Sequence, residues 1–302
     1  FTLMDATGTG RPQVLAWGPA GLRLDGVAAG SLKDVLWAAA GDFDNDGFSD
    51  VAAITVAGPA LLKNSRGRFT PVNVPWPKGS YRVAVWIDYD HDYDLDLVLL
   101  GASAAVMRNQ GKAGFAEVAN AMPFAQGIAM AARFTRKNPD GRGFDLEVSY
   151  EGGRNVLYRD QLGGAYRVEA GTAVPPVTEA HVDLNGDGVL DRVRKEADAV
   201  VAEVDTAKPA NGWLRIALTG VRNLKVAQDA FVEVKAGTLY RRQRYEGYPL
   251  TFNVGAAREV DTVRITWPNG LIQNEVKLGV NRAHLFKEAQ RLSGSCPIIW
   301  TW

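Results

Sequence analysis

The sequence predicts an all-β chain in which β-propeller blades are followed by a β-sandwich. Acidic residues alternate in three short loops, and the segments around these loops recur about every 47 residues. The last third of the chain alternates apolar and polar residues instead. Short alternating strands that are separated by glycine-containing turns, at a period in the forties, are typical of four-stranded propeller blades.

The repeat becomes visible when the segments that follow each loop are compared. Asp42 and Asp88 open loops that lie 46 residues apart, and the same order of strand-like segments follows both. The order returns after Asp145, where the preceding loop is less regular. Each unit supplies one strand before its loop and three after it. Five units are recognisable, and the sequence leaves open whether they form a small ring or part of a larger one.

The three acidic loops, residues 42–50, 88–96 and 183–191, each place side-chain oxygens at positions one, three, five and nine. Hard cations such as calcium take six to eight oxygen ligands, and a loop of this kind supplies most of them. Carboxylates this close repel one another strongly unless a cation lies between them. We therefore predict about three calcium ions bound to this chain, one in each loop.

Two other loops keep the shape of the repeat but lose its ligands. Residues 5–13 retain a single carboxylate, and residues 136–145 are one residue irregular and carry basic residues where ligands would lie. We expect both to be metal-free turns. The repeat fades after Asp191 and ends at the Lys-Pro-Ala-Asn-Gly stretch of residues 208–212, which contains turn-forming residues. We therefore predict a propeller domain over residues 1–207.

The loops and their spacing resemble the FG-GAP/VCBS repeat family, whose calcium-binding propeller blades also occur in integrin α subunits. The resemblance covers residues 1 to about 205, and the DxDxDGxxD pattern is its specific part. It implies calcium between neighbouring strands, with the seventh loop position offering its backbone carbonyl. Tyr93 departs from the pattern, because it replaces the sixth-position glycine and a bulky residue is strained in a left-handed conformation. The implied ligands are Asp42, Asp44, Asp46, Phe48 and Asp50; Asp88, Asp90, Asp92, Asp94 and Asp96; and Asp183, Asn185, Asp187, Val189 and Asp191.

Residues 208–290 are predicted to form a second, β-sandwich-like domain. From Trp213 onward, alternating segments are broken by glycine and Pro-Asn-Gly turns, which is typical of antiparallel strands with one wet face. Val260-Asp-Thr-Val263 followed by Trp267-Pro-Asn-Gly270 resembles the ASPIC/UnbV domain, which commonly follows VCBS-type propellers in cartilage acidic protein and in secreted bacterial proteins. This resemblance implies architecture rather than mechanism. Residues 291–302 are an apolar segment that we expect to begin a further region.

Charge and motifs narrow the classes of function. The chain has 34 basic and 34 acidic residues, so it lacks the basic excess of a nucleic-acid binder. Its longest apolar run, residues 97–107, is too short to span a bilayer. It contains no nucleophile elbow, phosphate loop, HExxH or paired-cysteine zinc motif. Its three histidines, His91, His181 and His284, lie far apart and predict no common site.

These observations favour a secreted, calcium-binding module that binds protein or glycan partners, with calcium in a structural role. We expect it in an extracellular or periplasmic compartment, where free calcium is high enough to fill weak sites. Tyr240, Tyr245 and Tyr248, around an arginine run, are candidates for an exposed contact surface. Two alternatives stay open: a polysaccharide-active enzyme that uses the propeller face, and a subunit of an extracellular assembly or filament.

Overall fold

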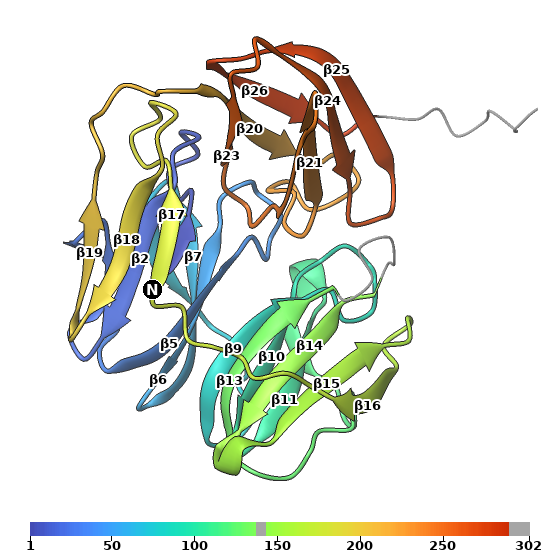
Figure 1. Cartoon of the computed structure of the whole chain (residues 1–302). Coiled ribbons are helices and arrows are strands. Elements are labelled where there is room, and N and C mark those ends of the chain that lie inside the picture. The colour runs from blue at the N-terminus through green and yellow to red at the C-terminus, as the bar shows by residue number, and fades with distance from the viewer. Residues whose placement is uncertain (137–142, 290–302) are drawn as a thin grey trace, which may run out of the picture.

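The computed structural model describes residues 1–136 and 143–289, and strands dominate this part of the chain (Figure 1). Its helical content is two short 3-10 turns, Gly111–Ala113 and Glu151–Gly153. No helix within the described ranges is long and apolar enough to cross a bilayer. The strands form five sheets before residue 204 and two sheets after residue 211.

The first five sheets are the predicted blades, numbered here 1 to 5 in chain order. Blade 1 contains β1 (Thr2–Met4), β2 (Gln13–Gly18), β3 (Gly21–Leu24) and β4 (Val27–Ala28). Blade 2 contains β5 (Val35–Gly41), β6 (Asp50–Thr55), β7 (Gly58–Ser65) and β8 (Arg68–Val72). Blade 3 contains β9 (Tyr81–Ile87), β10 (Asp96–Gly101), β11 (Ala104–Asn109) and β12 (Phe115–Glu117). Blade 4 contains β13 (Ala129–Thr135), β14 (Asp145–Tyr150), β15 (Asn155–Asp160) and β16 (Tyr166–Ala170). Blade 5 has three strands, β17 (Glu179–Val182), β18 (Asp191–Glu196) and β19 (Ala199–Glu203).

The predicted unit of one strand before a loop and three after it is confirmed in blades 2, 3 and 4. All pairings within the blades are antiparallel, and each blade runs in chain order from its first to its last strand. The three acidic loops join the first and second strands of blades 2, 3 and 5. Residues 5–13 occupy the same place in blade 1. The all-β, propeller-like fold therefore agrees with the repeat read from the sequence.

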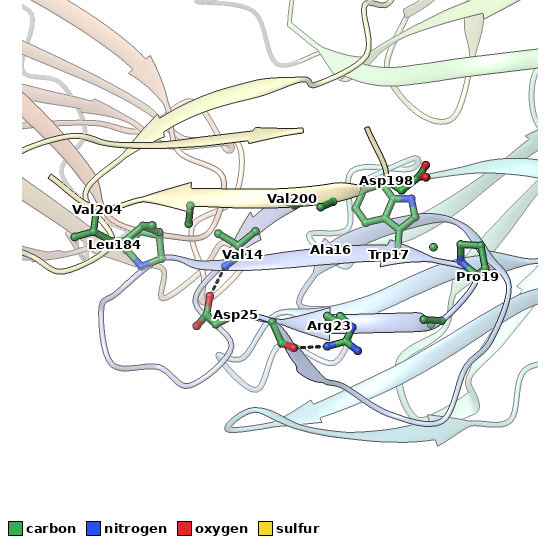
Figure 2. Close-up of a pocket in the computed structure, with 17 residues that line it drawn as sticks. Val14, Ala16, Trp17, Pro19, Arg23, Asp25, Leu184, Asp198, Val200 and Val204 are labelled. Atoms are coloured by element: carbon green, nitrogen blue, oxygen red, sulfur yellow. Dashed lines mark hydrogen bonds between the residues drawn. The ribbon is translucent and has the colours of Figure 1, made fainter. Parts of the chain in front are cut away.

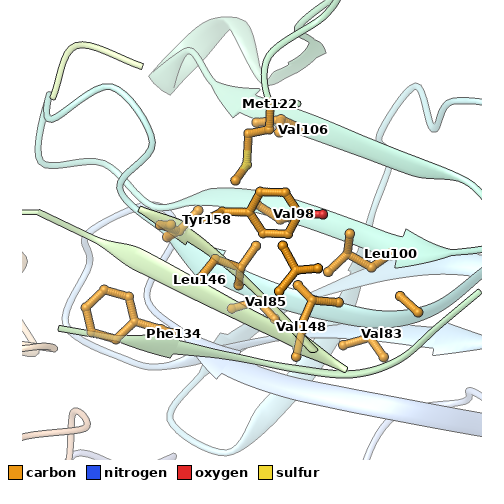
Figure 3. Packing of buried hydrophobic residues seen from close by; sticks show 14 of the residues in the cluster. Val83, Val85, Val98, Leu100, Val106, Met122, Phe134, Leu146, Val148 and Tyr158 are labelled. Atoms are coloured by element: carbon orange, nitrogen blue, oxygen red, sulfur yellow. The ribbon is translucent and has the colours of Figure 1, made fainter. Parts of the chain in front are cut away.

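Apolar seams hold the blades face to face in the spatial order 5, 1, 2, 3, 4. The seam between blades 3 and 4 contains Val83, Val98, Leu146 and Tyr158, all of them fully buried (Figure 3). Separate buried clusters join blade 1 to blade 2, and blade 2 to blade 3. A smaller cluster, which includes Val14 and Val193, joins blade 5 to blade 1. Burial of branched and aromatic side chains between sheets is therefore what stacks the blades.

The blades form an open arc, because no buried apolar cluster of the described residues joins blade 4 to blade 5. The two faces at the ends of the arc carry ion pairs. On blade 5, Arg192 contacts Glu179 at 2.7 Å, and on blade 4, Arg133 contacts Glu147 at 2.6 Å. Charged side chains lose too much hydration to form an apolar seam. The polarity of these two faces agrees with the absence of an apolar seam between blades 4 and 5 among the described residues.

A recurring polar contact links each blade to the loop of its neighbour. Asn64, at the end of the third strand of blade 2, donates its Nδ2 to the carbonyl of Ala6 in blade 1 at 2.8 Å. Asn109 in blade 3 donates in the same way to Phe43 in blade 2 at 2.7 Å. In blade 4 the corresponding residue is Asp160, which lies 2.7 Å from Nε2 of His91 in blade 3.

The second domain is a sandwich of two sheets, as predicted. One sheet has the order β23 (Leu250–Gly255), β20 (Gly212–Thr219) and β26 (Arg282–Lys287), with β20 and β26 parallel. The other has the order β22 (Leu239–Arg244), β21 (Phe231–Ala236), β24 (Glu259–Thr266) and β25 (Ile272–Gly279). Trp267, Phe252 and Ile216 fill the space between the sheets. The predicted C-terminal segment 291–302 lies outside the described residues.

The sandwich lies on the loop side of the arc. Asp183 of the third acidic loop accepts a hydrogen bond from Thr251 Oγ1 at 3.2 Å, and the Lys225 N–H donates to Asn45 Oδ1 at 2.6 Å. Arg136 at the end of β13 lies over the ring of Phe231, 5.7 Å from its centre. The second domain is thus held by the first and third acidic loops and by Arg136 of blade 4.

Replacing Asn109 with alanine is expected to lower the free energy of unfolding by roughly 2 kcal/mol, because two carbonyls at a buried position lose their donor. Urea denaturation followed by fluorescence measures the change. Asn274→Ala, on the exposed edge strand β25, is the matched control and should change stability little. Equal stability of the two variants would contradict a stabilising role for the contact between blades 2 and 3.

Candidate calcium loops

The three acidic loops fold in one way around their first aspartate. In each, this carboxylate accepts backbone N–H groups from the fourth to sixth loop positions, which curls the loop around it. The donors are Asp46 and Gly47 to Asp42 (3.0 and 2.8 Å), Asp92 and Tyr93 to Asp88 (3.1 and 3.3 Å), and Gly186 and Gly188 to Asp183 (2.5 and 3.0 Å).

The curl requires left-handed backbone at the fourth and sixth positions of every loop. Glycine adopts this conformation without strain, whereas other residues do not. Tyr93 has a φ of 69° at the sixth position, where Gly47 and Gly188 have 98° and 90°. The expected strain at Tyr93 is therefore present in the structure, and the second loop keeps the shared shape in spite of it.

The fifth and seventh positions are also joined alike. The seventh-position N–H groups of Phe48, Asp94 and Val189 donate to the fifth-position carboxylates at 3.0, 3.0 and 2.8 Å. This bond fixes the orientation of each fifth-position side chain relative to its loop. The predicted seventh-position residues thus occupy equivalent places, and each of them orients a predicted ligand.

The ninth-position aspartates Asp50, Asp96 and Asp191 are fully buried at the start of the second strand. Each joins two distant parts of its blade. Asp50 accepts the N–H of Phe43 at 3.1 Å and that of Asn64 at 2.7 Å, and Asp96 accepts those of Tyr89 and Asn109 at 2.8 and 2.7 Å. In blade 5, Asp191 accepts the N–H groups of Leu184 and Asp205 at 2.7 and 2.8 Å.

Two of the loops bring three carboxylates together. The groups are Asp42, Asp44 and Asp50 in the first loop, and Asp88, Asp90 and Asp96 in the second, with one oxygen of each residue within 4.8 Å of the others. Asp90 Oδ1 is buried and has no hydrogen-bond partner. Among the residues that the structure describes, these are the two such groups of acidic or other metal-binding side chains.

The third loop differs in its third position. Asn185 stands there, and its Nδ2 donates to Asp187 Oδ2 at 2.7 Å. Its amide oxygen accepts the N–H of Asp187 at 3.0 Å. The third loop therefore has the fold of the other two but one carboxylate fewer, and its first aspartate also contacts the second domain.

Burial makes the inner carboxylates unusually basic. It raises the pKa of Asp42 to about 7 and that of Asp50 to about 8, and the neighbouring charge on Asp44 adds to both shifts. In the second loop burial raises the pKa of Asp88 to about 7 and that of Asp96 to about 8. Without a cation, these loops therefore hold negative charge at a free-energy cost that protonation relieves.

A basic side chain lies against each of the two acidic groups, which the sequence analysis missed. Lys63 Nζ contacts Asp44 and lies 3.0 Å from Asp46, and Arg108 Nε lies 2.5 Å from Asp90. Both stand directly before the linking asparagines Asn64 and Asn109. In the sequence, these contacts are indicated by a basic residue followed by an asparagine, a pair that occurs as Lys63-Asn64 and again one repeat later as Arg108-Asn109. The two cations offset part of the loop charge from the outer side.

The residues present fit a calcium ion. The donors are oxygens alone, which suits a hard cation, and the unpartnered Asp90 Oδ1 is an available ligand atom. Asp42, Asp44 and Asp50 would hold an ion in the first loop, and Asp88, Asp90 and Asp96 in the second. A bound ion would supply charge neutralisation there, in place of the side chains of Lys63 and Arg108.

The loop of blade 1 has the same curl without the acidic ligands. Asp5 accepts the N–H groups of Thr9 and Gly10 at 3.1 and 2.7 Å, and Gly8 has a φ of 68°. The curl thus depends on the first aspartate and on left-handed residues. Of the other degenerate loop, residues 137–142 lie outside the described residues, while Asp145 accepts the N–H of Asp160 at 3.0 Å as the other ninth-position residues do.

The histidines do not form a common site. His91 contacts Asp160 of the next blade, and although burial alone would lower its pKa, the carboxylates of Asp160 and Asp88 raise it. His181 is on the charged outer face of blade 5, 3.4 Å from Glu179. His284 Nε2 lies 2.8 Å from the carbonyl of Gly279 in the sandwich.

The expected exposed surface at the arginine run is only partly correct. Tyr240 is exposed, but Tyr245 is buried and its hydroxyl accepts the N–H of Leu218 at 3.1 Å. Arg242 lies 4.2 Å from the centre of the Phe231 ring, and Arg244 lies 5.0 Å from that of Phe134 in blade 4. Arg242 thus packs on its own sandwich domain and Arg244 packs against blade 4, because guanidinium groups stack well on aromatic rings.

Comparisons with known proteins agree with parts of this description. The family model described as ASPIC and UnbV matches residues 222–293, within the sandwich domain and just beyond it. Among curated protein sequences, none matches the chain.

Solved structures that are similar to this chain have low identity and low TM-scores. One is a lectin of Agrocybe aegerita described as recognising non-reducing terminal N-acetylglucosamine, with 16% identity over 83% of this chain and 84% of that one and a TM-score of 0.40. Another is BBS1N in complex with ARL6DN, with 14% identity over 91% of this chain and 90% of that one and a TM-score of 0.39. The biofilm matrix protein Bap1 of V. cholerae has 13% identity over 91% of this chain and 47% of that one, with a TM-score of 0.35.

Replacing Tyr93 with glycine is expected to stabilise the chain by roughly 0.5–1 kcal/mol, since removal of left-handed strain outweighs the added flexibility of glycine. Thermal unfolding in the presence of calcium measures the gain. Tyr81→Gly is the opposing control, because this buried tyrosine has ordinary backbone and its loss should destabilise. A lower unfolding temperature for Tyr93→Gly would contradict the strain.

Proposed function

We propose that this chain is an extracellular or periplasmic binding and scaffold module of the FG-GAP/VCBS type, in which calcium has a structural role. The observation that carries the proposal is the convergence of three carboxylates in each of two loops, one with a buried oxygen that has no hydrogen-bond partner. The shared curl of the third loop supports a third, weaker site at Asp183, Asp187 and Asp191.

Calcium would act on the packing of the blades. The same loops that offer ligands also contact the neighbouring blade and the sandwich, through Phe43 and Asn45 in particular. A cation that neutralises a loop would therefore strengthen several junctions at once. Because calcium would bind the folded chain and not the unfolded one, it stabilises the fold by mass action, by about 2.7 kcal/mol per site at a hundred times the Kd.

A binding role is supported by the hollow between the two domains. A cavity of about 510 Å³ lies there, and it is lined by Asp5, Lys225, Arg215 and His284 together with loop glycines. This size suits a small ligand or the end of a larger one, and the mixed charged and apolar lining suits protein or glycan partners.

Calcium is expected to raise the unfolding temperature, and a chelator to lower it. In calorimetric titration, Asp46→Ala and Asp187→Ala should each weaken calcium binding, since each removes a fifth-position carboxylate that the loop orients. Asp198→Ala, in the exposed turn between β18 and β19, is the control and should bind calcium as the parent does. An unfolding temperature that is the same in calcium and in excess chelator would overturn the structural role.

A glycan array tests the partner class. We expect the fluorescently labelled chain to bind a restricted set of glycans in calcium and to lose this binding in chelator, since Gly47 of the first acidic loop lines the cavity between the domains. Arg215→Ala, which alters the cavity lining, should weaken the binding, whereas Arg11→Ala, at an exposed position, should not. No glycan binding in calcium would restrict the proposal to protein partners, and cleavage of an arrayed polysaccharide would overturn it in favour of an enzyme.

A further inference from the structure

Among residues 1–136 and 143–289, blade 5 has no fourth strand, whereas each of the other blades has one. Within the described residues, β19 pairs with β18 alone, whereas β7, β11 and β15 each have a further strand at the corresponding edge. In blades 2 to 4 a glycine turn follows the third strand and returns the chain as the fourth. In blade 5 the chain continues instead through residues 204–211 into the sandwich. The position of the fourth strand is therefore left open.

The free edge of β19 presents backbone groups that can bind another strand. Lys195 donates its N–H to Thr178 on the β17 side, so its partner Val200 directs its own N–H and carbonyl away from β18. Two residues further along the strand, Ala202 has the same orientation. The sequence of β19 is Ala-Val-Val-Ala-Glu, so it has neither a lysine nor a proline to protect the edge.

An apolar groove lies beside this edge. It has a volume of about 680 Å³ and separates β19 from β2 and β3 of blade 1 (Figure 2). Val200, Ala202 and Val204 line one wall, and Val14 and Ala16 line the other. The groove is thus the unfilled outer part of the seam between blades 5 and 1, continuous with the buried contact of Val14 and Val193.

Several polar side chains of the groove are already engaged, whereas Asp198 is exposed to water. Asp25 accepts the N–H of Val14 at 2.8 Å and Gln13 Nε2 at 2.9 Å, and Arg23 donates to the carbonyl of Gly26 at 2.6 Å. Trp17 Nε1 donates to the carbonyl of Leu36 at 3.2 Å. The hydroxyls of a sugar would find few free hydrogen-bond partners here, whereas apolar side chains need none.

The other blades show what fills the same position. In blade 2, Val72 at the end of the fourth strand packs against the seam with blade 3. In blade 3, Val118 directly after the fourth strand packs against the seam with blade 4. The opposite face of blade 5 carries Arg192 and Glu203 and faces water. A strand at this edge thus needs valine-like side chains on one face and polar ones on the other.

We propose that the edge of β19 binds an extended segment of a partner polypeptide as the fourth strand of blade 5. The segment has about five residues, matching β19, with apolar side chains at alternate positions that enter the groove and polar ones on the outer face. This assignment rests on the proposed binding function and deepens it by naming the partner as a polypeptide strand. It places the contact away from the cavity between the domains.

Fluorescence anisotropy with a labelled peptide tests the assignment on the full chain in calcium. The probe is a synthetic peptide of about eight residues that alternates valine with lysine or glutamate. We expect saturable binding that Ala202→Pro weakens about tenfold or more, since proline removes an outward N–H. Val200→Lys, which places a charge in the groove without changing the backbone, should weaken it as well.

Val168→Pro is the matched control. Its N–H also points away from the neighbouring strand, at the outer edge of blade 4, which already has four strands. Circular dichroism and thermal unfolding establish that each variant is folded.

Binding that is absent, or equal in the parent and both β19 variants, overturns the proposal. A dimer that Ala202→Pro dissociates in light-scattering measurements also overturns it, by assigning the edge to a second copy. Glycan binding in the same preparation separates failure of this site from failure of the proposed function.

Discussion

The buried aspartate at the ninth loop position is the constraint on which the blades depend. Asp50, Asp96 and Asp191 each accept one N–H from their own loop and one from a residue near the end of the third strand. A carboxylate held in this way fixes the first hairpin relative to the third strand. In blades 2 and 3 the residue tied to it, Asn64 or Asn109, then reaches the preceding blade. One polar network thus sets both the shape of a blade and its junction.

The arrangement separates loop shape from cation affinity. The loop of blade 1 curls around Asp5 although its third, fifth and ninth positions carry no carboxylate. The curl therefore comes from backbone bonds to the first aspartate and from left-handed residues. The additional carboxylates raise the charge density beyond what this shape requires, and burial makes their ionisation costly. The proposed cation sites would account for that free-energy cost, and Lys63 and Arg108 offset part of it from the outer side of the loops.

Much of this structure could be predicted from the local sequence pattern, because the repeat fixes the order of the strands. The glycines Gly47 and Gly188 also indicate which loop positions have left-handed backbone. The predicted loop ligands fall at equivalent places for the same reason. The open arc and the missing strand of blade 5 could not be predicted, since they depend on which face of a sheet meets a neighbour. Arg192 and Glu179 look like ordinary surface residues in the sequence, yet together they keep one end of the arc exposed. Tyr245 was misjudged because its burial is decided by the sandwich.

The second domain restricts the positions of two of the acidic loops. It contacts the first loop at Asn45 and the third at Asp183, so two of the three acidic loops are held from both sides. The second loop is linked instead to blade 4 through His91 and Asp160, and it alone carries the strained Tyr93. Contacts from outside a loop restrict the positions of its carboxylates before any ion binds, which lowers the ordering cost of binding. The first loop combines such a contact with three converging carboxylates and an unstrained glycine, and it is therefore the best preorganised of the three.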